Sequence, residues 1–169
     1  MVSKRKFVTA DPEKCVGCAI CELVCSYQKA KVFNPIRSRI RIVRLPPSIY
    51  LSVTCRLCED PACVTACPRE AVTSSEETGV VTIDQDKCNG CGWCVEACEF
   101  GAITLDPETK VMMACDLCEE RDEGPMCIEW CPEEALDMMT RETLAEKARI
   151  ATAKKLFAEV LKREVAATA

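Results

Sequence analysis

Residues 88–98 read Cys-Asn-Gly-Cys-Gly-Trp-Cys-Val-Glu-Ala-Cys, and residues 15–25 read Cys-Val-Gly-Cys-Ala-Ile-Cys-Glu-Leu-Val-Cys. Both stretches space four cysteines as CxxCxxCxxxC, with a glycine before the second cysteine. The match continues upstream at a constant offset of 73 residues, which indicates an internal repeat. The shared upstream residues are Val8, Thr9, Asp11 and Lys14 in the first copy and Val81, Thr82, Asp84 and Lys87 in the second.

Two further cysteine groups repeat one another. Residues 55–71 begin Cys-Arg-Leu-Cys-Glu, residues 115–135 begin Cys-Asp-Leu-Cys-Glu, and both end as Cys-Pro-x-Glu-Ala, with four extra residues inside the second copy. All 16 cysteines therefore fall into four groups. The groups are Cys15, Cys18, Cys21 and Cys25; Cys55, Cys58, Cys63 and Cys67; Cys88, Cys91, Cys94 and Cys98; and Cys115, Cys118, Cys127 and Cys131.

These spacings favour 4Fe-4S cubes over other uses of cysteine. In the bacterial ferredoxin run CxxCxxCxxxC, three cysteines bind one cube and the fourth binds a second cube. A tetrahedral zinc ion usually takes two thiolates from one CxxC pair and two ligands from elsewhere, which leaves the triplets unexplained. A disulfide framework would require an oxidising compartment. Purely structural cubes remain an alternative, but four cubes in so small a chain favour a conduit for electrons. The sequence therefore predicts four 4Fe-4S clusters.

Composition and charge exclude several classes of function. The chain has 169 residues and a formal net charge of -5, and four cubes with thiolate ligands would bring this to roughly -13. Nucleic acid is therefore not an expected partner. Histidine is absent, which removes the commonest general base and the usual catalytic zinc ligand. We expect a non-catalytic protein.

The N-terminal sequence and the distribution of apolar residues bear on location. The first residues show no apolar segment of the secretory type, and charges interrupt every apolar stretch before it reaches the roughly 18 residues that a membrane-spanning helix needs. We expect a cytoplasmic protein with no direct membrane insertion.

The predicted secondary structure is sparse. Short strands are expected at 7–10, 80–84, 102–105 and 111–114, the last two joined by the turn Asp106-Pro-Glu-Thr, and short helical turns are expected after each fourth cysteine. The pattern of strand, metal loop and short helix, repeated, indicates the α+β class. Because so few apolar residues remain for a core, metal binding is expected to supply much of the folding free energy.

The order of four differently spaced groups resembles the four-cluster ferredoxin-type subunits that serve molybdenum and tungsten oxidoreductases, over residues 7 to about 137. The resemblance implies two interlocked bacterial-ferredoxin-like modules related by a pseudo-twofold axis over residues 1–139, followed by a C-terminal helical arm over 140–169. It also implies that the groups exchange their fourth ligands. The implied sets are Cys15, Cys18 and Cys21 with Cys131; Cys115, Cys118 and Cys127 with Cys25; Cys55, Cys58 and Cys63 with Cys98; and Cys88, Cys91 and Cys94 with Cys67.

The same resemblance implies a function. The chain looks like an electron-transfer subunit that relays single electrons between a large catalytic subunit of the tungsten or molybdenum pterin type and a second redox protein or ferredoxin. It is most similar to the small subunits of tungsten aldehyde oxidoreductases and of class II benzoyl-CoA reductases. Within electron transfer, the alternative is an iron-sulfur subunit of a formate, hydrogenase or carbon monoxide dehydrogenase complex. From another class, the alternative is an iron-sulfur redox sensor, although no residues remain to build an output domain.

Two positions depart from the ferredoxin pattern. Proline follows Cys67 and Cys131, but Ser26 follows Cys25 and Glu99 follows Cys98. The number of ligands is unchanged, whereas the local turn and the cluster potential are left open. Glu99 would lower the potential of a cluster if it pointed inward, and a solvated surface position is the expected alternative.

A basic segment lies between Ser26 and Cys58, which contains no acidic residue. The alternation of Arg39 and Arg41 with Ile40 and Ile42 predicts a strand with one solvated face. This segment is either an edge strand protected by charge or a docking surface for an acidic partner. The aromatic residues Trp93, Trp130, Tyr27 and Tyr50 are expected to pack over cluster walls rather than to act as stepping stones for electrons.

The C-terminal segment has a different character. Thr143-Leu-Ala-Glu predicts a capping box that begins a helix of about twenty residues, ending near Val165. Its apolar stripe contains Ile150, Phe157, Val160 and Leu161, with Leu144, Ala148, Ala151 and Leu156 widening it. No cysteine group remains for this stripe to cover, so we expect it to pack on another polypeptide, with packing on its own cluster domain as the alternative.

Overall fold

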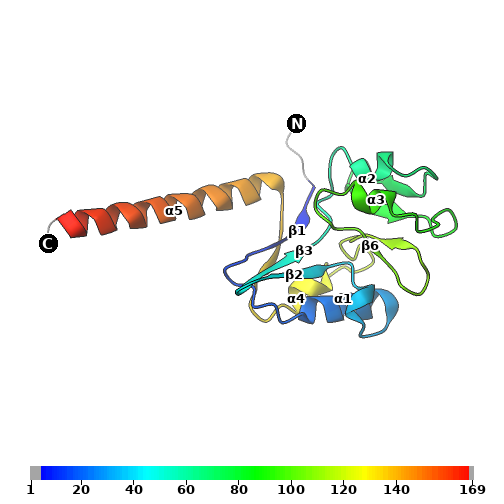
Figure 1. Cartoon of the computed structure of the whole chain (residues 1–169), viewed down its shortest axis with the longest axis horizontal. Helices are drawn as coiled ribbons and strands as arrows, with labels where there is room; N and C mark the ends of the chain where they lie inside the picture. The colour runs from blue at the N-terminus through cyan, green and yellow to red at the C-terminus, as the bar shows by residue number, and fades with distance from the viewer. Residues whose placement is uncertain (1–4, 168–169) are drawn as a thin grey trace.

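The computed structural model describes residues 5–167, with side chains described as far as Ala158 and at Val160. Short strands and helices form a body from which one long helix extends (Figure 1), so the predicted mixture of helix and strand is confirmed. The elements are β1 Phe7–Ala10, α1 Ile20–Ala30, η1 Pro35–Arg37, β2 Arg41–Leu45, β3 Ile49–Val53, α2 Ala62–Thr65, β4 Val72–Ser74, β5 Val81–Ile83, α3 Trp93–Glu96, β6 Thr104–Leu105, β7 Met112–Met113, α4 Met126–Glu129, β8 Leu136–Met139 and α5 Arg141–Ala167.

The strands pair as four antiparallel two-stranded sheets, β1 with β8, β2 with β3, β4 with β5, and β6 with β7. The sheet β1–β8 joins the two ends of the body, because it brings the strand before the first cysteine group against the strand after the fourth. The sheet β4–β5 does the same for the second and third groups.

The sheets β1–β8 and β4–β5 have matching registers. Ala10 lies opposite Leu136 and Ile83 lies opposite Val72. Next to these pairs, the amide of Asp11 donates to the carbonyl of Ala135, and that of Asp84 to the carbonyl of Ala71, each at 2.8 Å. The sequence repeat therefore reappears as a repeat of strand pairing.

Some of the predicted strands agree with the structure and some were missed. The strand Phe7–Ala10 is confirmed, and β5, β6 and β7 lie inside the predicted ranges, with the 106–109 turn between the last two. The strands β3, β4 and β8 were not predicted. β4 and β8 are short and directly follow the turn after a fourth cysteine, a position that we had expected to be helical.

The helical turn expected after the fourth cysteine is confirmed at Cys25, where α1 continues to Ala30, and is wrong in the other three groups. Helices α2, α3 and α4 each contain the third cysteine of a group and end before the fourth. After the fourth cysteine the chain turns sharply, with left-handed backbone at Glu70, Gly101 and Glu134. A left-handed residue ends a helix and redirects the chain, here toward the segment that follows each group.

The apolar interior is divided between two cores, and β1 contributes to both. Phe7 is buried with Leu57, Val72, Val80, Val81, Ala102, Ile103, Met112 and Ala114. Its neighbour Val8 is buried with Val24, Ile40 and Leu136. Successive side chains of a strand point to opposite faces, which explains why adjacent residues enter different cores. Buried cysteines belong to both cores, so the thiols are part of the packed interior.

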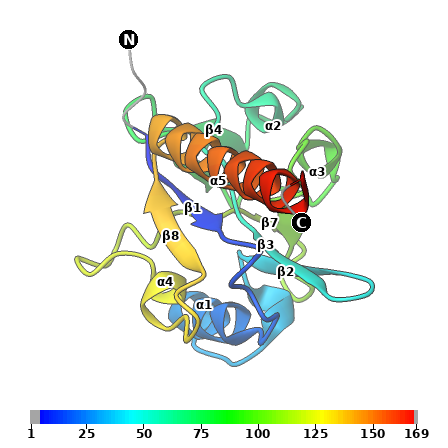
Figure 2. The same ribbon diagram turned by 90° about the vertical axis from the view of Figure 1, so that its left-hand side faces the viewer.

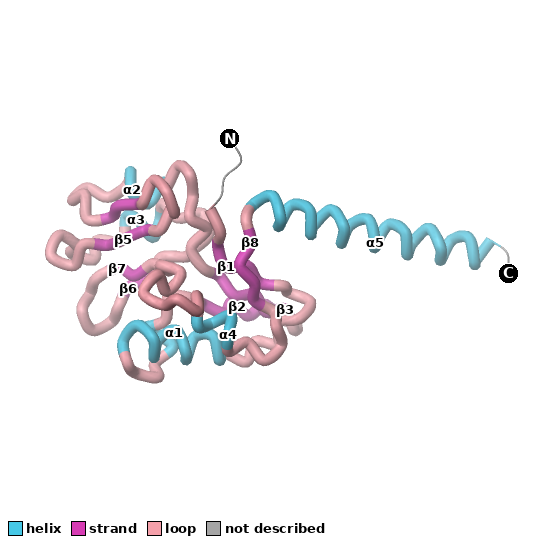
Figure 3. The backbone as a smooth tube through the Cα atoms, turned by 180° about the vertical axis from the view of Figure 1, so that it is seen from behind, coloured by secondary structure: helices cyan, strands magenta, loops and turns pink. Residues whose placement is uncertain are grey.

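Helix α5 extends away from the body over most of its length (Figures 1 and 3), and in Figure 2 it is foreshortened and runs obliquely across the front of the body. Its N-terminus was predicted three residues too late. The hydroxyl of Thr140 accepts a hydrogen bond from the amide of Thr143 at 3.3 Å, so Thr140 is the capping residue and the predicted box at Thr143 does not form. The stripe residues Ile150, Phe157 and Val160 are exposed, and the side chain of Leu161 lies outside the described residues. Within residues 5–167, no helix has the length and apolarity needed to cross a bilayer.

Candidate iron-sulfur sites

Two cavities are each lined by four cysteines. One cavity is lined by Cys15, Cys18, Cys21 and Cys131, together with the apolar residues Val16, Ile42 and Leu136. Another is lined by Cys67, Cys88, Cys91 and Cys94. Each set combines three cysteines of one group with the fourth cysteine of another group, more than 20 residues away in the chain.

For the other eight cysteines, electrostatic interactions between thiols show which sulfurs lie near one another. Burial raises the pKa of Cys63 to about 11, and the neighbouring thiols of Cys55, Cys98 and Cys58 add to this rise. The sulfur of Cys98 therefore lies beside the second cysteine group.

The remaining set gathers around the fourth cysteine group. Burial raises the pKa of Cys115 to about 12, with Cys25, Asp116 and Cys55 contributing. Burial also raises the pKa of Cys127, with Cys115, Cys25, Cys118 and Cys21 contributing. All four of these cysteines are buried. Four buried thiols in one place are costly to ionise unless a cation compensates their charge, which is the property expected of a metal-cluster site.

The donor sets suit a cube better than a single ion. Each set offers four sulfur donors and no histidine, as a 4Fe-4S cluster requires. Within the described part of the chain, no group of three or more Cys, His, Asp or Glu side chains is arranged to hold one metal ion.

The fourth cysteine of every group accepts a backbone hydrogen bond at sulfur. The amides of Ala71, Ala102 and Ala135 donate to Cys67, Cys98 and Cys131, in each case from four residues further along the chain, at 3.3, 3.4 and 3.3 Å. The amide of Arg39 donates to Cys25 at 3.3 Å. At Cys67, burial alone would raise the pKa, but the amides of Arg69, Ala71, Val72 and Glu70 outweigh it and lower the pKa. Such bonds stabilise a thiolate ligand.

The aspartates of the sequence repeat position the first cysteines. The amides of Glu13 and Asp86 each donate to the carboxylate two residues earlier, that of Asp11 or Asp84, at 3.0 Å. The backbone carbonyls of these aspartates accept from the amides of Cys15 and Cys88, both at 3.0 Å. The repeat had marked Asp11 and Asp84 without giving them a role. Their role is to turn the chain from the strand into the cysteine loop.

A glycine in each of the repeated loops lies under another segment of the chain. Gly17 and Gly90 have φ of +69° and +71°, a conformation that glycine adopts without steric cost. A Cβ at Gly17 would lie 2.5 Å from Cδ1 of Tyr50, and a Cβ at Gly90 would collide with the carbonyl oxygen of Lys110. Tyr50, which belongs to β3, therefore covers the first cysteine loop.

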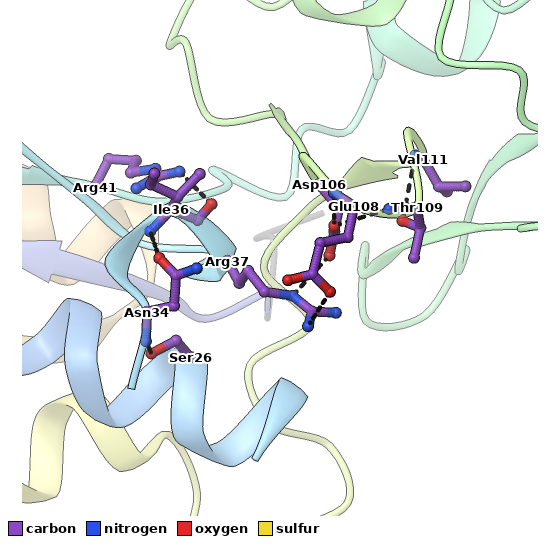
Figure 4. Close-up of polar contacts among 9 residues, drawn as sticks. All are labelled: Ser26, Asn34, Ile36, Arg37, Arg41, Asp106, Glu108, Thr109 and Val111. Carbon is purple, nitrogen blue, oxygen red and sulfur yellow. Dashed lines mark hydrogen bonds and ion pairs between the residues drawn. The ribbon is translucent and has the colours of Figure 1, made fainter. Parts of the chain in front are cut away.

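The basic segment is used inside the body. The guanidinium of Arg37 pairs with Asp106 and Glu108, each at 3.0 Å, across the gap between η1 and the β6–β7 turn (Figure 4). Lys29 pairs with Asp116 at 2.9 Å and with Glu120, and Arg39 also pairs with Asp116. Lys29, Arg37 and Arg39 therefore join the segment after the first cysteine group to two other segments. One is the β6–β7 turn, which follows the third group, and the other is the start of the fourth group.

The pKa shifts agree with this pairing. Burial would raise the pKa of Asp106, but the amides of Thr109 and Glu108 and the charge of Arg37 outweigh it, so the pKa is lowered. Burial would lower the pKa of Lys29, and its bonds to Glu120 and Asp116 reverse the direction. Arg37 and Arg39 therefore pair with acidic residues of the chain itself, while Arg41 lies in β2, a strand of a two-stranded sheet as the edge-strand alternative expected.

The two departures from the ferredoxin pattern have different structural settings. Ser26 is fully buried inside α1, donates to the carbonyl of Leu23 at 2.8 Å and accepts from the amide of Asn34 at 3.1 Å. A proline here would interrupt α1, which explains the serine. Glu99 is exposed at the surface. Glu99 therefore occupies the solvated surface position that was expected as the alternative to an inward-pointing carboxylate.

The aromatic residues do not act as one group. Trp93 lines the cavity of Cys67 and Cys88 but is 63% exposed, and Trp130 is 54% exposed. Tyr27 stacks on Phe33 with ring centroids 4.8 Å apart. The expectation that these rings pack over cluster walls agrees with Trp93, which lines one of the cysteine cavities, and stays a prediction for Trp130.

The comparisons with known proteins agree with the cysteine chemistry. The model of the 4Fe-4S dicluster domain family matches residues 47–141. The polyferredoxin-like subunit of an aliphatic sulfonate oxidoreductase from Pyrococcus furiosus is 39% identical, over 82% of this chain and 78% of that protein. The electron transport protein HydN of Escherichia coli K12 is 34% identical, over 85% of this chain and 95% of that protein.

Among solved structures, a chain of the active site complex BamBC of benzoyl coenzyme A reductase, with benzoyl-CoA, is similar. It has a TM-score of 0.50 and 27% identity, covering 95% of this chain and 96% of that one. The family match covers more than half of the chain, and its relatives are electron-transport and oxidoreductase proteins. The chain therefore belongs to the 4Fe-4S dicluster family of ferredoxin-like, iron-sulfur electron-transport proteins.

Proposed function

We propose that this chain is an electron-transfer subunit that carries four 4Fe-4S clusters and relays single electrons between a large catalytic subunit and a second redox protein. The observation that carries the proposal is that two cavities are each lined by three cysteines of one group and the fourth cysteine of another, with Cys98 beside the second group and Cys25 beside the fourth. A cube held by each set would take up and release one electron at a time.

The proposed ligand sets are those that the resemblance implied. Cys131 completes the first group and Cys25 the fourth, while Cys98 completes the second and Cys67 the third. The matching registers of β1–β8 and β4–β5 support two interlocked modules related by a pseudo-twofold axis, one built on each sheet. This arrangement accounts for the sequence repeat, because corresponding residues perform the same local task in both modules.

The residues around the sets would control electron access. Cys18 and Cys91 are exposed and belong to different sets, whereas Cys25 and its three partners are all buried. Electron transfer falls off steeply with distance, so the sets of Cys18 and Cys91 are the proposed points of entry and exit. The buried set would serve as an internal step of the relay.

The proposed catalytic partner is of the tungsten or molybdenum pterin type. Its support is the resemblance of the four-group pattern together with the similarity to a chain of the BamBC active site complex. Subunits of formate, hydrogenase or carbon monoxide dehydrogenase complexes remain the alternative. A redox sensor has less support, because the long segments outside the cysteine groups in the described structure are residues 26–54, which form part of the body, and the single helix α5. The need to keep 16 thiols reduced for cluster assembly supports a cytoplasmic location.

Metal and sulfide analysis of anaerobically purified protein tests the proposal. Four cubes require about 16 iron and about 16 sulfide per chain. Electron paramagnetic resonance monitors their stepwise one-electron reduction. A reproducible value near half of this, with zinc making up the remainder, would rule out the four-cluster assignment. Molybdenum or tungsten in the copurifying large subunit would support the proposed partner, and nickel would favour the alternative.

A further inference from the structure

The second and fourth cysteine groups carry opposite charges at one equivalent position of the repeat. Arg56 follows Cys55 in the second group, and Asp116 follows Cys115 in the fourth. Cys55 and Cys115 are buried in the same apolar core, and their thiols act on one another electrostatically. The two proposed sets are therefore neighbours. The Cys55 set is Cys55, Cys58, Cys63 and Cys98, and the Cys115 set is Cys115, Cys118, Cys127 and Cys25.

The guanidinium of Arg56 packs on two aromatic rings. Its Cζ lies 5.2 Å from the ring centroid of Phe7 and 5.9 Å from that of Phe100. Phe7 is buried in the same core as Cys55, and Phe100 follows Cys98 by two residues. The face of an aromatic ring attracts a cation. Because Cys55 and Cys98 belong to one proposed set, the two rings hold the cation beside that set.

The charge of Arg56 is not balanced by a carboxylate of the described residues. Burial lowers the pKa of the guanidinium, and no carboxylate in that part of the chain counters the effect. Arginine nevertheless stays charged in proteins. Glu59, the nearest acidic residue in the sequence, pairs with Arg141 at 2.9 Å. A second guanidinium, that of Arg5, donates to the backbone carbonyl of Cys58 at 2.7 Å, an acceptor without net charge.

The charges beside the Cys115 set cancel. The carboxylate of Asp116 pairs with Lys29 at 2.9 Å and with Arg39, and it accepts a hydrogen bond from the amide of Cys118 at 3.1 Å. Lys29 also pairs with Glu120, so two cations face two carboxylates. All four cysteines of this set are buried, whereas three of the four in the Cys55 set are partly exposed.

Local charge and burial act in the same direction on the two sets. Reduction adds one negative charge to a cube, so a nearby cation stabilises the reduced form and raises the reduction potential. Burial without a net positive charge disfavours the added charge and lowers the potential. The cation of Arg56 acts across apolar surroundings, where electrostatic interactions are stronger than in water.

We propose that the charge of Arg56 holds the reduction potential of the cluster in the Cys55 set above that of the cluster in the neighbouring Cys115 set. This inference rests on the proposed function, because it needs a cube in each of the two sets. Arg56 is not a ligand and acts only through its charge. An electron shared between these neighbouring sites rests at the Cys55 set.

A redox titration of the anaerobically purified full-length chain, followed by electron paramagnetic resonance, tests the proposal. The signal that Cys58→Ala removes or alters belongs to the Cys55 set, and the signal that Cys118→Ala removes or alters belongs to the Cys115 set. This assignment does not depend on which cysteine supplies the fourth ligand. We expect the first signal to have the higher midpoint potential in the unmodified chain, and the reverse order would overturn the proposal.

Substitutions of Arg56 separate its charge from its packing. Arg56→Gln should make reduction of the Cys55 set at least tenfold less favourable, which is a drop of about 59 mV for one electron. Arg56→Lys keeps the charge and should change it less than threefold. The control Arg149→Gln removes the same charge from a side chain of α5 that is 75% exposed, and it should also change reduction less than threefold. An unshifted midpoint in Arg56→Gln, or equal drops in the Gln and Lys variants, would overturn the proposal.

A second pair of variants leaves Arg56 in place, so the proposal stays testable if Arg56→Gln does not assemble its clusters. Phe100→Glu puts a carboxylate beside the guanidinium, and Phe100→Gln puts a side chain of the same shape there without a charge. We expect reduction of the Cys55 set to be at least threefold less favourable in Phe100→Glu than in Phe100→Gln. Equal midpoints in these two variants would overturn the role of local charge.

Iron and sulfide content separates this inference from the proposed function. Arg56→Gln with about 16 iron per chain and an unshifted potential would reject the role of Arg56 and leave the proposed function standing. An unmodified chain with about half of this iron, and zinc in place of the remainder, would reject the proposed function itself.

Discussion

Cys25 and Cys98 occupy corresponding positions in the sequence repeat, yet their surroundings differ. Helix α1 continues past Cys25 to Ala30, whereas α3 ends at Glu96, before Cys98. The sulfur of Cys98 accepts a hydrogen bond from the amide four residues later, as in the second and fourth groups. At Cys25 the residues that follow remain helical, and the donor is Arg39, 14 residues away.

The difference shows how a repeat becomes asymmetric. The longer α1 leads into a basic segment, and Lys29 and Arg39 of this region pair with Asp116, next to Cys115. The proposed set of Cys25 is consequently buried as a whole, whereas in the corresponding set of Cys98 only Cys55 is buried and Cys58, Cys63 and Cys98 are partly exposed. One extended helix therefore separates an internal cluster site from a site that solvent and partners can reach.

Removal of the metal should have the largest effect, because it eliminates the cluster at Cys25 as well as the cluster at Cys98. Cysteines form part of both apolar cores, and four buried thiols cannot replace the bonds that a cube supplies. We expect oxidative iron chelation to unfold the body cooperatively, measured by circular dichroism together with visible absorbance. Native circular dichroism that persists after complete cluster loss would show that the polypeptide packs without metal.

Removing the two corresponding cysteines should affect clusters that are distant in sequence. Cys25→Ala should lower the iron content from about 16 to about 12 per chain by eliminating the cluster of Cys115, Cys118 and Cys127. It should spare the cluster of Cys15, Cys18 and Cys21, although these are its closest neighbours in sequence. Electron paramagnetic resonance of the reduced protein distinguishes the clusters.

Cys98→Ala provides the matched control. It should eliminate the cluster of Cys55, Cys58 and Cys63 and leave that of Cys88, Cys91 and Cys94 in place. If either variant instead loses the cluster of its own group, each group closes its own cube, and the proposal of two interlocked modules must be abandoned.

The sequence predicted the chemistry of the cysteines better than the structure around them. The repeat identified the four groups, and β1 was predicted with its bounds. The exchange of fourth ligands came only from a resemblance, since spacing does not show which distant thiol turns toward which group. Three of the four helical turns were misplaced because the left-handed residues after the fourth cysteine include Glu70 and Glu134, which carry no turn signal in the sequence.

Long-range pairing was also beyond the sequence. Arg37 finds Asp106 and Arg39 finds Asp116, 69 and 77 residues away. The clustering of cations between Ser26 and Cys58 indicated an acidic partner, but nothing in the spacing showed that this partner lies in the same chain. The position of Tyr50 over the first cysteine loop agrees with the expectation that it packs on a cluster wall, although the strand β3 that positions it was not predicted.

The two corresponding glycines should differ in their tolerance of a side chain. Alanine at either position is strained by the left-handed backbone, at about 1–2 kcal/mol. At Gly90 the added Cβ meets the backbone carbonyl of Lys110, which cannot move alone, so Gly90→Ala should destabilise by on the order of 3 kcal/mol. At Gly17 the obstacle is the ring of Tyr50, which can rotate away. The thermal unfolding midpoints of both alanine variants, measured under anaerobic conditions, give their loss of stability. An equal loss at Gly17 and Gly90 would contradict the expected difference.

The smallest expected effect concerns the ion pairs that join η1 to the β6–β7 turn. Arg37 pairs at the same distance with Asp106, whose side chain is 7% exposed, and with Glu108, whose side chain is 66% exposed. A charge left unpaired in a buried position costs more than one in solvent, so Arg37→Ala should destabilise by about 1–3 kcal/mol, mainly through Asp106.

A double-mutant cycle separates the two pairs. The coupling free energy of Arg37 with Asp106, from Arg37→Ala and Asp106→Asn, should be at least twice that with Glu108, from Arg37→Ala and Glu108→Gln, for which we expect below about 0.5 kcal/mol. The measurement belongs at neutral pH. The pKa of Asp106 is lowered, so its stabilisation is complete above its ordinary pKa and is lost as the pH falls through the lowered value. Equal couplings would mean that burial does not distinguish the two carboxylates, and the contact between η1 and the β6–β7 turn would then be an ordinary surface ion pair.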